Sequence, residues 1–133
     1  MNTRFIMLAS AALMAGLGLI ASFLPHELLQ QLGEETTGIM PVLVQVLGAL
    51  YLGFAILNWM AKGILIGGIY ARPVALGNFM HFLVGALALL KAGQHLHGYV
   101  LWPLALGYSV LAVLFGLIAF RHPLAAKVPA DKV

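Results

Sequence analysis

The chain has 133 residues, of which 62% are hydrophobic and only 8% are charged, and its net charge is +3. A soluble domain carries roughly 25% charged residues to cover its water-facing surface, so this composition excludes a soluble globular domain and indicates a chain surrounded mostly by lipid. The sequence contains no cysteine, which excludes disulfides and thiolate chemistry, and with no long basic run we expect no nucleic-acid partner.

Four uncharged apolar runs follow one another along the chain, each close to the length that crosses a bilayer. About 20 apolar residues are needed, because a helix rises about 1.5 Å per residue through roughly 30 Å of hydrocarbon. Backbone groups inside lipid must be satisfied within the segment, which favours helices. We therefore predict an all-α fold, a four-helix transmembrane bundle that forms a single membrane domain over residues 1–133, with spans at about 5–24, 39–60, 74–90 and 100–120.

The first run also lies where a cleaved signal peptide would lie. Its apolar stretch exceeds the length of about 7–15 residues that is typical of a signal peptide. The small-residue triplet Ala9-Ser10-Ala11, which resembles a cleavage site, falls in the middle of the run. We interpret the run as a retained first span.

The connections carry two short features. Residues 63–71 are uncharged and glycine-rich, and we interpret them as an interfacial or re-entrant connection. Pro73 then falls in the first turn of the third helix, where its missing N–H costs nothing. Residues 25–33 are predicted to form an amphipathic turn in the outer interface, with an outer lid over the bundle as the alternative. The side chains expected to dip into lipid there are Leu28, Leu29 and Leu32.

Basic residues are distributed unevenly over the two ends of the spans. With the N-terminus inside, one side holds six of them, namely Arg4, Lys62, Arg72, Arg121, Lys127 and Lys132. The other side holds Lys91 alone, beside Glu27, Glu34 and Glu35. Short loops rich in Lys and Arg remain in the cytoplasm. We therefore predict an N-in, C-in protein of the bacterial inner (cytoplasmic) membrane.

Small residues four apart recur in every span. Helices in lipid associate through close contact of small residues, and residues four apart lie on one helix face. We therefore predict that these faces pack together, although glycine and alanine are also common in membrane helices in general. The sets are Ala12/Gly16, Ala49/Gly53, Gly77 with Gly85, and Ala105/Ser109 with Ala112/Gly116.

Polar side chains inside the spans are the candidate functional residues, because burying them in hydrocarbon is costly. Asn58, Asn78 and His81 should lie at a similar depth, and consecutive antiparallel spans are usually neighbours. We predict that these three residues form one polar cluster, and we add Tyr108 as a fourth candidate ligand-binding residue. Three interpretations stay open for the cluster: a clasp between helices, a site for a ligand or lipid headgroup, or proton chemistry.

The histidines give little support for a cofactor or metal. His81 is the only one inside a span, so a haem held by two histidines of this chain is not expected, whereas a haem shared with a partner chain stays open. His95 and His97, joined by Glu34 or Glu35, would form a metal site only with three or four ligands, and we expect a solvated loop instead. We predict no cofactor, no metal and no catalytic residue, since hydrolase motifs are also absent from the sequence.

The stretch VLGALYLGFAILNW, from Val46 to Trp59, is followed after Arg72-Pro73 by LGNFMH, which ends at His81. This pattern resembles a group of small uncharacterised bacterial four-span membrane proteins that is similar in layout to the DoxX-like family. The resemblance covers residues 46–81 and the hydropathy layout elsewhere. It implies a four-span fold and no particular activity.

These patterns together predict a non-enzymatic membrane protein, either an accessory or scaffold subunit or a binder of a small amphiphile or lipid. The four spans contain no Asp, Glu, Lys or Arg, which disfavours a coupled transporter. One alternative is a membrane oxidoreductase, or a quinone- or haem-associated subunit, that uses His81 and Tyr108. A small oligomeric channel is another. The expected partners are membrane lipid and either further copies of this chain or a larger membrane complex.

Overall fold

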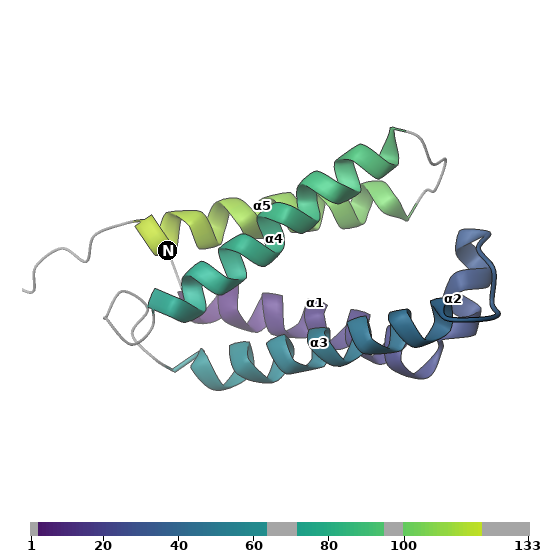
Figure 1. The fold of residues 1–133 in the computed structure, drawn as a ribbon. Helices are drawn as coiled ribbons and strands as arrows, with labels where there is room; N and C mark the ends of the chain where they lie inside the picture. Colours follow the sequence, from purple (N-terminus) through teal and green to yellow (C-terminus); the bar gives the residue numbers. More distant parts are fainter. Residues whose placement is uncertain (1–2, 64–71, 95–99, 121–133) are drawn as a thin grey trace, which may run out of the picture.

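The computed structural model describes residues 3–63, 72–94 and 100–120, which are helical apart from short turns (Figure 1). Within these ranges there is no strand. The fold therefore confirms the predicted all-α class. The elements are α1 (Thr3–Phe23), α2 (Pro25–Leu32), α3 (Met40–Ala61), α4 (Arg72–Gly93) and α5 (Leu101–Phe120).

Four of these helices, α1, α3, α4 and α5, are long and apolar enough to cross a membrane. Large hydrophobic side chains point outward along all four, for example Leu50, Leu87 and Leu106, which are 60%, 60% and 67% exposed. A water-soluble fold would bury such side chains, so the arrangement fits an integral membrane protein. The bounds of these four helices agree with the predicted spans to within a few residues, and Pro73 lies in the first turn of α4 as expected.

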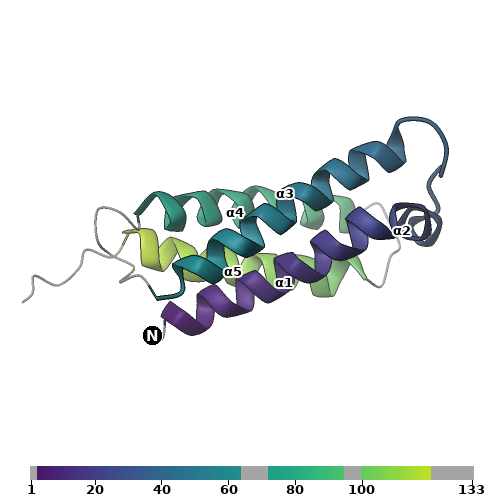
Figure 2. The same cartoon turned by 90° about the horizontal axis from the view of Figure 1, so that it is seen from below.

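The long helices form two pairs, with α1 along α3 and α4 along α5 (Figures 1 and 2). Within the first pair the backbones come close together at Gly18 and Gly48. A Cβ atom on Gly18 would lie 3.0 Å from the carbonyl oxygen of Gly48, and one on Gly48 would lie 2.7 Å from the amide nitrogen of Ser22. Only glycine permits this approach. Between the two pairs the helix backbones come close at far fewer points.

The predicted small-residue faces are only partly confirmed. Gly85, Ala105, Ala112 and Gly116 do face a neighbouring helix. Ser109 is half-buried and donates to Ala105 O of its own helix (2.7 Å). The prediction is wrong for the remaining residues, because Ala12 and Ala49 are exposed and a Cβ atom on Gly16, Gly53 or Gly77 would meet nothing within 4 Å. A four-residue spacing places residues on one face without deciding which face packs. In α1 the packed face runs instead through Ser10, Met14 and Gly18.

The short helix α2 follows α1 at the end of the bundle away from the N-terminus. Its C-terminus is capped at Gly33 (φ 74°), where Gly33 N donates to Gln30 O (3.1 Å) and Glu34 N to Leu29 O (2.9 Å), as in a Schellman motif. Leu32 is exposed as predicted. Leu29, however, is only 2% exposed, because α2 packs on α1 and α3. For this leucine the expected lipid contact is wrong.

The ends of the bundle differ in charge. Arg4, Lys62 and Arg72 lie at the end where α1 begins, α3 ends and α4 begins, while Lys91 and α2 lie at the opposite end (Figure 1). This alternation is the one that the N-in, C-in prediction requires, and the direction across the membrane stays a prediction. Residues 64–71 of the predicted connection at 63–71 lie outside the described residues, as do the other basic residues of the N-in, C-in prediction and the loop histidines at 95 and 97.

Candidate functional site

Two asparagines bind each other in the interior, where α3 meets α4. Asn58 Nδ2 donates to Asn78 Oδ1 and Asn78 Nδ2 donates to Asn58 Oδ1, both at 2.7 Å. Both residues are 0% exposed. The sequence prediction that these two side chains meet is therefore confirmed, and we call the pair the amide clasp.

The remaining donors of the clasp are also used. Asn58 Nδ2 donates to Ser10 Oγ (3.1 Å), and this hydroxyl donates in turn to Met7 O (2.9 Å). Asn78 Nδ2 donates to Val74 O (2.9 Å). Each amide has two N–H donors, so all four are satisfied, and the network ties α1, α3 and α4 together. The clasp thus has the geometry of a structural link and keeps no N–H donor for a ligand.

Ser10 is the one member of this network that sequence reasoning missed. It appeared only within a small-residue triplet, and a serine often bonds to its own helix in a membrane span. Its depth gave a usable signal, because position 10 lies near the same end of the bundle as position 58 of the antiparallel helix α3.

His81 lies three residues after Asn78 but belongs to a different group of side chains. Its ring centroid is 5.1–5.6 Å from those of four aromatic rings, which come from α3, α4 and α5. The predicted single cluster is thus divided: the asparagines bond to each other, and no described hydrogen bond joins them to His81. We call the group around His81 the aromatic box; its other members are Tyr51, Phe54, Phe82 and Tyr108.

Nε2 of His81 is buried and has no hydrogen-bond partner among the described residues. A buried polar atom left unsatisfied costs about 1–3 kcal/mol. The ring meets Tyr51 and Phe82 edge to face, at interplanar angles of 88° and 82°. Contacts of a ring N–H with an aromatic face are weak, so they offset only part of this cost. The box therefore contains a buried polar atom, Nε2, whose bonding the described residues do not complete.

The other polar groups of the box are two tyrosine hydroxyls. Tyr108 OH donates to Tyr51 OH at 3.1 Å, which links α5 to α3 across the two helix pairs. The hydroxyl hydrogen of Tyr51 can then be donated to a further acceptor. Tyr108 is 2% exposed and its ring lies against Gly85 of α4, where a Cβ atom would be 2.6 Å from the ring. The glycine is thus what lets Tyr108 enter the box.

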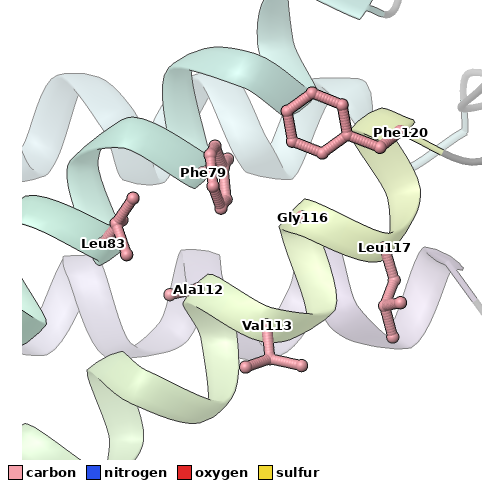
Figure 3. Close-up of a pocket in the computed structure, with 7 residues that line it drawn as sticks. All are labelled: Phe79, Leu83, Ala112, Val113, Gly116, Leu117 and Phe120. Atoms are coloured by element: carbon pink, nitrogen blue, oxygen red, sulfur yellow. The ribbon is translucent and has the colours of Figure 1, made fainter.

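A separate groove of about 480 Å³ lies between α4 and α5 (Figure 3). Phe79 covers Gly116 there and meets Phe120 edge to face, with ring centroids 5.5 Å apart. The groove has no polar side chain in its lining, so it offers an apolar surface and no chemistry. The remaining lining residues are Leu83, Ala112, Val113 and Leu117.

No group of three or more His, Asp or Glu side chains able to hold a metal occurs in the described ranges. His26 is the second residue of α2, and its Nδ1 lies 3.1 Å from Thr36 O. The other three histidines lie outside the described residues. Among the described histidines, only His81 is therefore placed in the interior of the bundle.

Fold and surface together define a helical protein whose four long apolar helices fit an integral membrane location. A comparison of the chain with known protein families, with curated proteins and with solved structures finds no match. A fold alone does not imply a function, so any function of this chain has to come from the side chains described above.

Proposed function

We propose that this chain is a non-enzymatic membrane protein that binds a small amphiphile between its two helix pairs. The polar group of the amphiphile bonds to Nε2 of His81 within the aromatic box, and its apolar part lies among the surrounding rings and lipid. The observation that carries this proposal is the buried Nε2 atom without a partner among the described residues. A ligand that completes this bond removes the cost of leaving it unmade.

The shape of the box supports a flat ligand. Aromatic rings favour offset or edge-to-face contact with another ring, and side chains from three helices surround His81. The two helix pairs approach each other at few backbone positions, so a ligand can insert with small helix shifts. The amide clasp, one turn away, holds the pairs together meanwhile.

A quinone-associated subunit is the second candidate, because the box presents two donors from different helices. Nε2 of His81, in the tautomer that carries the proton there, and the hydroxyl of Tyr51 can each donate a hydrogen bond. A quinone has two carbonyl acceptors on one flat ring. The Tyr51–Tyr108 bond across the helix pairs is the specific observation that favours this ligand class.

The test is to identify small molecules that co-purify with the chain in mild detergent, by native mass spectrometry and by solvent extraction. His81→Phe keeps an aromatic ring and removes the nitrogen, so the bound fraction should fall about fivefold, equivalent to one hydrogen bond. Phe115→Leu is a matched control, because Phe115 stacks on Phe82 and is not in contact with His81 among the ring pairs described. It should retain the ligand.

The outcomes separate the candidates. An ultraviolet absorption of the extract that changes on chemical reduction would identify a quinone. A bound species without this change would be another amphiphile. If the wild-type chain retains no small molecule, or if His81→Phe retains as much as wild type, the binding proposal is wrong. The scaffold interpretation then takes its place.

A further inference from the structure

A second groove, on the other helix pair, has a different character. It has a volume of about 310 Å³ and runs between α1 and α3. Four alanines make up most of its lining, which we call the alanine floor, and three larger side chains complete it. The lining residues are Leu8, Ala11, Ala12, Ala15, Ala55, Ile56 and Trp59.

Two cations stand at one end of this groove. Lys62 lies three residues beyond Trp59, and its Nζ is 3.2 Å from the centroid of the Trp59 ring. Arg4 is exposed and lies one turn before Leu8, on the same face of α1. Because α1 and α3 run antiparallel side by side (Figure 2), Arg4 and Lys62 come to the same end of the groove.

No carboxylate of the described residues lies at this end to neutralise the two cations. The glutamates Glu27, Glu34 and Glu35 all lie in or just after α2, at the opposite end of the helices. Two like charges beside an apolar groove are the complement of a molecule with an acidic head and a hydrocarbon tail.

We propose that the α1–α3 groove binds an anionic phospholipid. The acyl chain lies over the alanine floor, and the phosphate accepts charge-assisted hydrogen bonds from Arg4 and Lys62. Trp59 lines the groove at the depth where indole rings favour the headgroup boundary. This site is separate from the aromatic box, which lies between the helix pairs, so either proposal can fail without the other.

Charge, and not volume, distinguishes this groove from the others. The α4–α5 groove is larger, at about 480 Å³. Its nearest described cation along the helix, however, is Arg72, seven residues and about 10 Å of helical rise before Phe79. A depression of about 280 Å³ on α3, beside Ala49 and Gly53, does not include Trp59, the ring that Lys62 contacts, and its last lining residue, Leu57, lies five residues before Lys62. Of these three depressions among the described residues, only the α1–α3 groove combines an apolar floor with two cations at its end.

The first experiment measures lipid retention. Delipidated full-length protein is mixed with dioleoyl phosphatidylglycerol or with dioleoyl phosphatidylcholine, and native mass spectrometry gives the bound fraction. The wild type should retain the anionic lipid severalfold better. Arg4→Gln and Lys62→Gln should each lower that retention about fivefold, since a basic residue near the membrane surface contributes about that factor. Lys62→Arg keeps the charge and should retain the anionic lipid as well as the wild type does. Arg72→Gln makes the same charge change at the same end of the bundle and should leave retention unchanged.

The second experiment fills the groove. Ala12→Phe places a ring over the floor, whereas Ala49→Phe adds the same ring on α3 outside the groove. Both alanines are exposed, so helix content measured by circular dichroism should match wild type. Ala12→Phe alone should abolish the preference for the anionic lipid.

Three results would overturn the proposal. The first is equal retention of the two lipids by the wild type, and the second is an equal loss of retention in Arg72→Gln and Lys62→Gln. The third is a dimer that disappears in Ala12→Phe, which would show that a second copy of the chain, and not a lipid, occupies the groove.

Discussion

The amide clasp and the aromatic box both place polar atoms in the interior of the bundle, one helical turn apart. They differ in whether those atoms have hydrogen-bond partners. In the clasp, both amides of Asn58 and Asn78 have partners for every N–H donor. In the box, Nε2 of His81 has none among the described residues. A closed network accounts for its own presence by holding helices together. An incomplete one costs stability, and a ligand that supplies the missing partner would remove that cost.

The box also differs from the clasp in the size of its side chains and in the space that they need. The clasp uses short side chains between helices, while the box needs a glycine so that a large ring can enter. Tyr108 lies directly over Gly85 and is packed against Phe82, with ring centroids 5.2 Å apart. Its position therefore depends on the absence of a single Cβ atom.

The largest expected effect breaks the box at this point. Gly85→Ala places a Cβ atom 2.6 Å from the Tyr108 ring, which is 2% exposed and has little room to move. Overpacking of this kind costs about 3 kcal/mol at the upper end of its usual range. Thermal unfolding in detergent measures it. Gly77→Ala is the matched control on the same helix, because its Cβ atom would meet nothing within 4 Å. Equal melting temperatures for the two variants would contradict the geometry.

The next effect breaks the clasp. Asn58→Ala removes the partner of Asn78 and of Ser10 together. It should cost about 2 kcal/mol, because a buried amide is left unsatisfied. A membrane hydrogen bond between helices contributes on average only about 0.6 kcal/mol, so most of this loss is the penalty on Asn78.

A double-mutant cycle sharpens that prediction. Adding Asn78→Ala to Asn58→Ala removes the unsatisfied amide, so the second change should cost much less than it does alone. Unfolding free energies of the four proteins in detergent give the coupling. Additive losses would mean that the two side chains do not bond to each other in the folded protein.

How far the sequence predicts these features follows from the physics of lipid. The spans are readable because charged residues interrupt uncharged runs, and the pairing of Asn58 with Asn78 follows from their similar depth in consecutive antiparallel spans. The packed face of α1 was not readable, since lipid is as apolar as the protein interior and Ala12 is chemically as acceptable there as Ala11. For the same reason the sequence does not predict that Tyr51 and Phe54 lie in the aromatic box, because an aromatic ring in a span suits either lipid or the interior of a bundle.

The smallest expected effect on stability is the one that best separates the two regions. His81→Phe removes a nitrogen that has no partner among the described residues and keeps a ring among four others. Since no described bond is lost and an unsatisfied atom disappears, the ligand-free protein should unfold at the same temperature or slightly higher. Asn58→Ala, by contrast, should lower it. If Nε2 binds a ligand, His81→Phe should lose the bound small molecule while its stability without ligand stays unchanged. A clear fall in the unfolding temperature of ligand-free His81→Phe would instead show that Nε2 is bonded within the folded chain and that the box, like the clasp, is structural.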